Sequence, residues 1–294
     1  MEKFYHQEKN IKNANLIHLK YVDDLSLAEA INLPDKLVHA TGRVQPDTFH
    51  ARTGHALPIE KSKVYNQLLR TDEYARENGM KINQKKTKII VFNPCKSKDF
   101  MPEFPLNGQI LEVVEEMKLL GIIISSDLSW HANTEYIVTK ANKRLWMLRR
   151  LQNLGAEKED LLEIYRTQVR CVLEMAVPAW HSSISQLEKR NNERVQKSAF
   201  HIILGHDYIS YRNALKVLNL ESLDSRRNQL CLKFAKKCEK NEKFKYWFKL
   251  NENYKNTRTE KSRYCEVKSR LSRLQRSPIS FLTNILNDYY RRKK

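Results

Sequence analysis

Two adjacent aspartates stand near the start of the chain, in the segment Tyr21-Val22-Asp23-Asp24. Short apolar runs flank them, a pattern typical of a tight β-hairpin with the acidic pair at its turn. Such a turn lifts adjacent carboxylates out of a sheet, where their oxygens can bind hard divalent cations. Two cations held in this way can catalyse nucleotidyl transfer. Taken alone, however, the pair is more typical of a solvated turn, because aspartate tolerates turn geometry.

A basic segment, Asn83-Gln84-Lys85-Lys86-Thr87-Lys88, follows about sixty residues downstream. A lysine beside a metal site can neutralise phosphate charge. In isolation this segment is better interpreted as a solvated basic turn. A third segment, Met117-Lys118-Leu119-Leu120-Gly121-Ile122, then leads into helices. The order of these segments is much more specific than any one of them.

Local patterns predict the elements that hold these segments. The hairpin is expected within residues 15–30, followed by an irregular connection rich in proline and glycine. Apolar residues at helical spacing predict a helix from Glu60 to about Asn78, and Gly79 stands where a helix should stop. Strands are expected at Thr87–Phe92 and at Met117–Ile124.

From Trp130 onward the apolar pattern is helical. Four apolar stripes predict four helices that pack as a bundle over residues 130–240. The stripes are Ile137, Ala141, Leu145, Leu148 and Leu151; Leu161, Leu162, Tyr165, Val169, Val172 and Leu173; Leu187, Val195, Ala199 and Ile202; and Leu223, Leu230, Cys231, Phe234 and Cys238. A short helix is expected near Ile279–Leu286.

The chain of 294 residues is strongly basic, with a formal charge of +19. Residues 226–294 hold 21 Lys and Arg against 6 Asp and Glu, so most of the excess belongs to the tail. Such a charge favours nucleic acid as a partner, although a soluble protein with many solvated lysines would have the same composition.

The cysteines and the apolar segments of the sequence limit which classes of protein this chain could belong to. The five cysteines are an odd set without a CxxC pair, which indicates neither a disulfide framework nor a zinc site. The first residues do not resemble a signal peptide, and no apolar stretch is long enough for a membrane span. We therefore expect an intracellular protein, in the nucleus or the cytoplasm, with no membrane partner.

Taken together, these segments resemble the palm and thumb of non-LTR retrotransposon reverse transcriptases over about residues 12–290. Tyr21 to Asp24 is similar to the family's motif C, and Asn83 with Lys86-Thr87-Lys88 is similar to its motif D. Leu120-Gly121 resembles the primer-grip strand, motif E. Other segments resemble the family's thumb and its continuation: Lys140–Leu145, Val172–Trp180, Glu193–Ala199, Arg226-Arg227 and Arg276–Ser280. Met175 stands where the family usually has tyrosine.

The resemblance implies roles for individual residues. Asp23 and Asp24 would hold catalytic Mg²⁺ or Mn²⁺ in intact relatives, and Lys86 would face the phosphates. Contacts with RNA or DNA, as primer and template, are implied for Leu120, Gly121, Lys140, Lys143, Arg144, Arg226 and Arg227. The implied fold is α+β, with a partial palm that has an antiparallel sheet and a helix at 1–129, a helical thumb at 130–225 and a basic C-terminal extension at 226–294.

One part of the family's active site is not found among these residues. Motif A supplies another metal-binding aspartate and precedes the hairpin in the family, yet none of the 20 residues before Tyr21 is an aspartate. Loss of one carboxylate should weaken Mg²⁺ binding severely, so we expect a truncated RNA-directed DNA polymerase without autonomous activity. The alternatives are a non-catalytic nucleic-acid-binding module built on the thumb and the basic tail, and an expressed remnant with no selected role.

Overall fold

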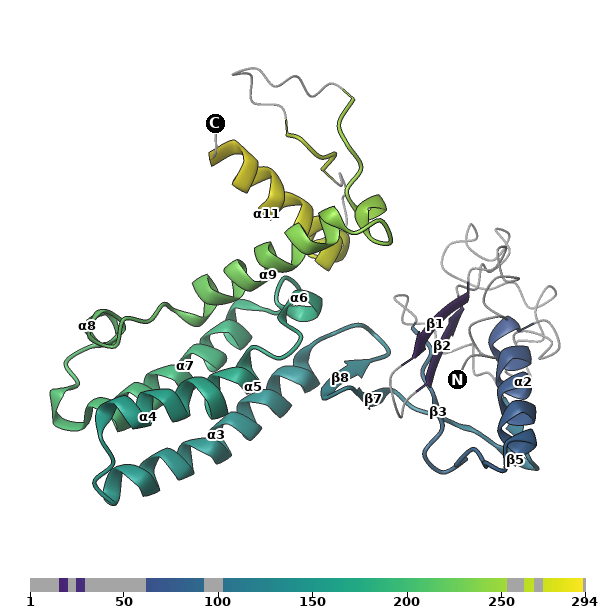
Figure 1. Ribbon diagram of the computed structural model, residues 1–294, viewed down its shortest axis with the longest axis horizontal. Helices are drawn as coiled ribbons and strands as arrows, with labels where there is room; N and C mark the ends of the chain where they lie inside the picture. The colour runs from purple at the N-terminus through teal and green to yellow at the C-terminus, as the bar shows by residue number, and fades with distance from the viewer. Residues whose placement is uncertain are drawn as a thin grey trace, which may run out of the picture. The chain divides into compact units, whose positions relative to one another are not determined.

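The computed structural model describes residues 16–20, 25–29, 62–92, 103–252, 262–266 and 272–292. It divides into two compact units, residues 1–117 and residues 118–294 (Figure 1). Helices predominate, and the described strands form four two-stranded pairs, which agrees with the predicted mixture of α and β structure. The boundary lies before the one expected at residues 129 and 130, because the hairpin at 116–125 packs largely with the helices that follow it.

In the first unit, the predicted N-terminal hairpin is confirmed. Strand β1 (Leu16–Lys20) pairs antiparallel with β2 (Leu25–Glu29), from Leu16 opposite Glu29 to Lys20 opposite Leu25. The four residues that connect the strands, Asp23 and Asp24 among them, lie outside the described part of the chain.

The predicted helix of the first unit is also confirmed, as α2 (Lys63–Glu77). The Ser62 hydroxyl caps its start by accepting from the backbone N–H of Tyr65, and Gly79 follows its end with a φ of 69°. The buried charged side chain of α2 is Asp72, which accepts a hydrogen bond of 3.1 Å from Asn107 and pairs with Arg76 at 2.9 Å. The helix is thereby tied to the turn at residue 107.

The strands after α2 are shorter than predicted. Strand β3 (Lys88–Ile89) pairs in parallel with β6 (Glu112–Val113), and β4 (Pro105–Leu106) pairs antiparallel with β5 (Gln109–Ile110). Asn107 and Gly108 have positive φ and form the tight two-residue turn that folds β5 back onto β4. Among the described residues these strands form separate pairs, so the single antiparallel sheet expected for a palm is not found there.

The second unit begins with a hairpin and continues as helices. Strand β7 (Glu116–Leu119) spans the boundary and pairs with β8 (Ile122–Ser125), as predicted around Gly121. The helical segments are α3 (His131–Asn153), α4 (Lys158–Ile164), the π-helical η4 (Tyr165–Arg170), α5 (Cys171–Leu173), α6 (Val177–Trp180), α7 (Gln186–Leu204), η5 (Gly205–Asp207), α8 (Tyr211–Val217), α9 (Leu223–Lys240), η6 (Lys245–Trp247), α10 (Ser272–Gln275) and α11 (Pro278–Arg292).

One hydrophobic core joins these helices, and the predicted stripes supply most of it. The buried members from the stripes are Ile137, Ala141, Leu145, Leu148, Leu161, Tyr165, Val169, Val172, Leu173, Val195, Ala199, Ile202, Leu223, Cys231 and Cys238. Leu187 does not belong to it, because it lies in the first turn of α7, is 62% exposed and precedes the buried face of that helix. Trp180 and Phe200 are buried core residues that the stripes did not include.

The C-terminal extension is not separate from this core. Helix α9 continues through the boundary expected between residues 225 and 226, and Leu282 and Leu286 of α11 join the same buried cluster. The Asn287 amide mimics a backbone partner for Tyr264, accepting from its N–H at 2.9 Å and donating to its carbonyl at 3.0 Å. The charge shift at residue 226 therefore marks a change of surface and not a change of domain.

Truncation of the core should show how strongly α3 depends on burial. Leu148 is fully buried, whereas Leu154 at the end of the same helix is 71% exposed. We expect Leu148→Ala to lower the free energy of unfolding in urea by about 3 kcal/mol, and Leu154→Ala by less than about 0.5 kcal/mol. Similar losses for the two variants would contradict this core.

His181 makes the stability of the helical unit depend on pH. The side chain is buried, with Nε2 3.3 Å from the Asn228 side-chain oxygen and its ring edge-on to Phe281. Burial, with the charges of Arg227 and Lys189, lowers the pKa of His181 to about 4. An unfolded histidine titrates near 6.5, so between these values the unfolded state binds more protons than the folded one. The stabilisation is therefore present above pH 6.5 and lost as the pH falls through this window.

We expect this residue to lower the free energy of unfolding by about 2 kcal/mol between pH 7 and pH 5. Urea unfolding followed by circular dichroism at both pH values measures the loss. In His181→Gln the loss between the two pH values should be smaller by that amount, because glutamine does not titrate. An identical pH dependence in the two proteins would rule out His181 as its source.

Candidate nucleic-acid interface

The Lys86 turn presents its lysine to solvent. The Asn83 carbonyl accepts from the backbone N–H groups of Lys86 and Thr87, at 3.1 and 3.0 Å, and Gln84 donates to the Leu106 carbonyl at 2.6 Å. Lys88 pairs with Glu112, whereas the Lys86 ammonium is exposed and has no ion pair with a described residue. Lys85 in the same turn is likewise exposed without an ion pair to a described residue, so the turn offers two cations to an external anion. Its position relative to Asp23 and Asp24 falls outside what the structure describes.

The Leu120-Gly121 turn, predicted to line a primer, has an uncommon backbone conformation. Both residues have positive φ, 48° and 89°, as a two-residue hairpin turn requires. Leu120 is 53% exposed in this conformation, which residues other than glycine rarely adopt. A Cβ at position 121 would lie 3.9 Å from Cε of Met175, so the hairpin tip approaches the residue at the family's tyrosine position. Two segments far apart in the sequence meet here.

Lysines gather around Tyr136 beside this hairpin. The Lys118 ammonium lies 4.8 Å from the centre of the Tyr136 ring, and that of Lys140 lies 5.6 Å from it. A hydrogen bond from Lys118 and the charge of Lys140 lower the pKa of Tyr136. Lys143, one turn beyond Lys140 on α3, is exposed. We call Lys118, Tyr136, Lys140 and Lys143 the Tyr136 patch.

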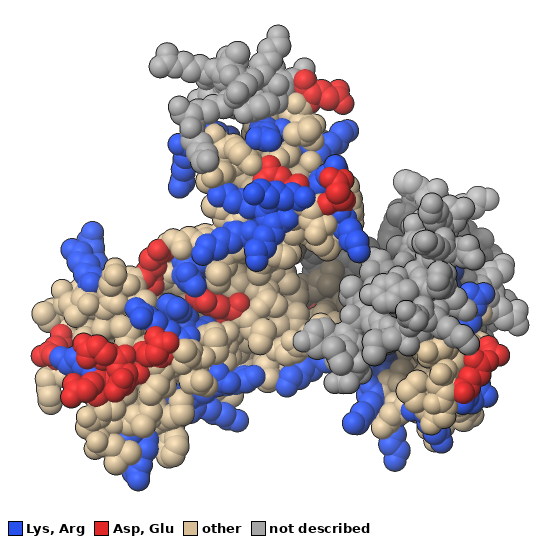
Figure 2. Space-filling view, in the orientation of Figure 1, with Lys and Arg blue, Asp and Glu red and all other residues tan. Residues whose placement is uncertain are grey.

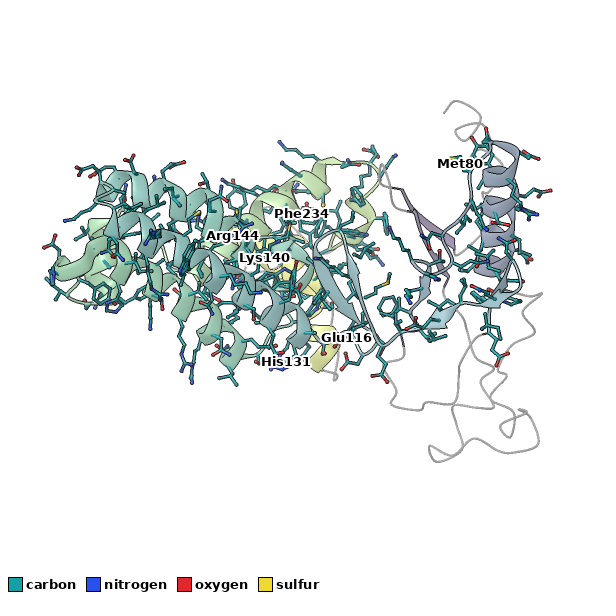
Figure 3. All side chains as sticks on the ribbon, turned by 90° about the horizontal axis from the view of Figure 1, so that it is seen from below. Met80, Glu116, His131, Lys140, Arg144 and Phe234 are labelled. Atoms are coloured by element: carbon teal, nitrogen blue, oxygen red, sulfur yellow. The ribbon has the colours of Figure 1, made fainter. Side chains whose placement is uncertain are left out.

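Arg144 lies next to this patch but is held to another helix. It is one turn beyond Lys140 along α3 (Figure 3). Its guanidinium donates to the Gln168 carbonyl in η4 and lies 3.6 Å from Sγ of Cys171. The predicted nucleic-acid contact of Arg144 would therefore have to be shared with this internal hydrogen bond.

Arg227 does not occupy the surface position predicted for it. It is 1% exposed, and its guanidinium donates to the Leu173 carbonyl at 2.8 Å and to the Asn192 side-chain oxygen at 3.2 Å. The group also lies 4.8 Å from the centre of the Trp180 ring. Burial lowers the pKa of Arg227 to about 10, which leaves it charged at neutral pH. Its role is internal, because a guanidinium used in this way is not available to a phosphate.

Arg226, its neighbour, lines a pocket of about 400 Å³. Arg166 and Arg170 of η4 lie in the same lining, with Gln196, Asn219, Leu220 and Glu221. Glu174 neutralises part of this charge, since it lies 3.2 Å from Nε of Arg226 and 3.6 Å from Nε of Arg170. The pocket is therefore arginine-rich but partly compensated, and it suits an anion less well than the exposed lysines do.

Lys118 and Tyr136 are functional candidates that the sequence analysis missed. Lys118 was visible as the residue two positions before the Leu-Gly turn, and Tyr136 as the residue four positions before Lys140. Their proximity depends on the packing of β8 against α3, where Asn133 accepts from the backbone N–H of Ile123 at 3.1 Å. Nothing local in the sequence signals that contact.

A metal centre is not found among the described residues, where no group of three or more His, Cys, Asp or Glu could hold an ion. The predicted ligands Asp23 and Asp24 are not part of that search. We therefore derive no chemical step that involves a metal.

Substitution of the two adjacent arginines should separate their roles. Arg227→Met leaves a buried carbonyl and amide oxygen unpaired, and we expect the free energy of unfolding to fall by about 3 kcal/mol. Arg226→Met removes a half-exposed ion pair and should cost no more than about 1 kcal/mol. Urea unfolding of both variants measures the difference. An equally small loss for Arg227→Met would mean that its buried contacts do not stabilise the fold.

Three comparisons with known proteins find no relative of this chain. A scan of the chain against protein-family models gives no match, and the searches of curated proteins and of solved structures find no similar protein. Within the part of the chain that the structure describes, no helix combines the length and the apolar character that crossing a bilayer requires. The likeness to reverse transcriptases therefore rests on the motif residues alone.

Proposed function

We propose that the chain is the palm and thumb portion of a reverse transcriptase of the non-LTR retrotransposon type, and that its second unit binds nucleic acid. The observation that carries the proposal is the meeting of the Leu120-Gly121 hairpin, Met175 and the Tyr136 patch. In the family that the sequence resembles, the corresponding segments belong to the primer grip and the thumb. Their convergence in space supports a common role.

The charges of the Tyr136 patch suit a phosphate backbone. Lys118, Lys140 and Lys143 form no ion pair with any described residue, so their ammonium groups remain available to an external anion. The ammonium groups of Lys118 and Lys140 lie over the Tyr136 ring, which limits the freedom that each lysine would lose on binding. A duplex of primer and template offers a regular row of phosphates to such a surface.

The binding role can be tested with the double variant Lys140→Gln, Lys143→Gln. Each lost phosphate contact should make the log–log salt dependence of duplex binding shallower by about 0.9, so the slope should change by about 1.8. Fluorescence anisotropy with a labelled duplex, at salt concentrations from about 50 to about 300 mM, measures this slope. As a control, Arg212→Gln, Lys216→Gln removes two exposed cations that lie one helical turn apart on α8. Equal effects of the two pairs would reduce the interface to nonspecific charge.

The catalytic part of the proposal concerns Asp23 and Asp24. We propose that these carboxylates descend from a metal-binding pair. The 20 residues before Tyr21 hold no aspartate that could serve as a third ligand, so we propose that residues 1–294 by themselves bind Mg²⁺ too weakly to polymerise. A purified chain given primer, template, Mg²⁺ or Mn²⁺ and labelled nucleotide should incorporate none. Incorporation that Asp23→Ala abolishes would refute the claim of inactivity while supporting the ancestry.

The alternative is a non-catalytic nucleic-acid-binding module built on the thumb and the basic tail. The basic tail and the Tyr136 patch favour it equally, because both act through charge. The two readings differ in the first unit: a module needs only residues 118–294, whereas a polymerase remnant needs Lys86 beside the acidic pair.

A further inference from the structure

Helix α9 carries a row of lysines on the side away from the core. Lys233, Lys236, Lys237 and Lys240 follow each other at spacings of three, one and three residues, which places them on one helical face. The opposite side is buried through Leu223, Arg227, Cys231, Ala235 and Cys238. Lys and Arg side chains gather over α9 (Figure 2). We call these four lysines the lysine face of α9.

Little negative charge opposes this face. The two acidic residues of α9 are already engaged: Asp224 pairs with Lys189 at 3.0 Å, and Glu239 accepts hydrogen bonds from the hydroxyls of Tyr264 and Tyr290. Lys233, Lys237 and Lys240 are exposed and form no ion pair with a described residue. Lys236 lies over the ring of Tyr289, with its ammonium 3.3 Å from the ring centre. Three free cations thus extend over about 10 Å of helix.

Exposed aromatic rings follow directly after these lysines. Tyr246 is 75% exposed and Phe244 is 38% exposed, both around the short helix η6. Trp247 supports them, with its ring centre 5.1 Å from that of Phe244 and 6.3 Å from that of Tyr246, while it also packs on the core. Backbone hydrogen bonds from Phe244 and Lys245 to the Asn241 carbonyl hold this turn at the end of α9. The rings are therefore fixed in place without being buried.

We infer that the lysine face of α9 and the rings of Phe244 and Tyr246 form a binding surface for single-stranded nucleic acid, separate from the Tyr136 patch. Phosphates would lie along the lysines, and an unpaired base would stack on Tyr246. Cations that follow a backbone beside accessible rings are the means by which proteins hold unpaired strands. A duplex hides the faces of its bases, so it can use the lysines but not the rings.

An anionic membrane surface would also attract lysines and aromatic residues. An amphipathic helix binds a bilayer through its apolar side, however, and the apolar side of α9 is buried in the core. The side of α9 that remains exposed carries lysines, which favours a hydrated polyanion. This inference rests on the proposed function only in taking nucleic acid as the ligand.

Fluorescence anisotropy of the full chain with a labelled oligothymidylate of about 20 nucleotides, and with a duplex of the same length, tests the inference. Lys233→Gln, Lys237→Gln, Lys240→Gln should make the salt slope for the single strand shallower by about 2. Tyr246→Ala should weaken single-strand binding at least about fivefold without changing the slope, and Tyr246→Phe should preserve it. Duplex binding should not change in Tyr246→Ala. Because Tyr246 is exposed, unchanged circular dichroism is expected for both tyrosine variants.

Several outcomes would overturn the inference. They are unchanged single-strand binding in the triple lysine variant, equal losses for single strand and duplex in Tyr246→Ala, and tighter binding to phosphatidylserine vesicles than to the oligonucleotide. If the chain binds the duplex through Lys140 and Lys143 but the α9 variants bind the single strand as the unchanged protein does, this inference fails while the proposed function stands. If the chain binds neither nucleic acid, both fail.

Discussion

The guanidinium of Arg227 connects four helical segments inside the second unit. From α9 it reaches the Leu173 carbonyl at the end of α5, the Asn192 side chain in α7 and the Trp180 ring in α6. The Leu173 carbonyl is free for this contact because the helix stops there and Ala176 turns the chain with a φ of 48°. A buried cation with defined acceptors fixes the rotation of α9 about its axis. Since one side of α9 must face these acceptors, its lysines must face solvent.

The same constraint organises the charge of the protein. In the described part of the chain, many of the basic residues after residue 226 lie on α9 and α11, which pack on the core. Glu239 accepts hydrogen bonds from the hydroxyls of Tyr264 and Tyr290, so its carboxylate is not available to pair with the lysines of α9. The Tyr136 patch, on α3 and β7, is built differently, from lysines laid over a tyrosine ring. The two cationic surfaces of this helical unit thus differ in chemistry: one is a group of lysines over a tyrosine ring, and the other is a regular row of lysines followed by exposed aromatic rings.

Helical periodicity predicted most of this unit, because Ile137, Ala141, Leu145 and Leu148 are spaced as one buried face requires. The β1–β2 hairpin and the turn at Gly121 were predictable from equally local patterns. The two arginines at 226 and 227 were not, because adjacent helical residues point about 100° apart and no local pattern tells which one is buried. That choice is made by a carbonyl 54 residues away in the sequence. The approach of Gly121 to Met175 and the cluster around Trp247 are likewise set by tertiary packing.

We propose that the second unit holds nucleic acid with its exposed lysines. Lysine acetylation of the folded chain, followed residue by residue by mass spectrometry with and without an oligonucleotide, examines it most directly. Bound nucleic acid should protect Lys233, Lys237 and Lys240 from acetylation and leave Lys216 on α8 as reactive as before. Equal reactivity of all four lysines in the presence and absence of the oligonucleotide, or protection of Lys216 alone, would contradict it.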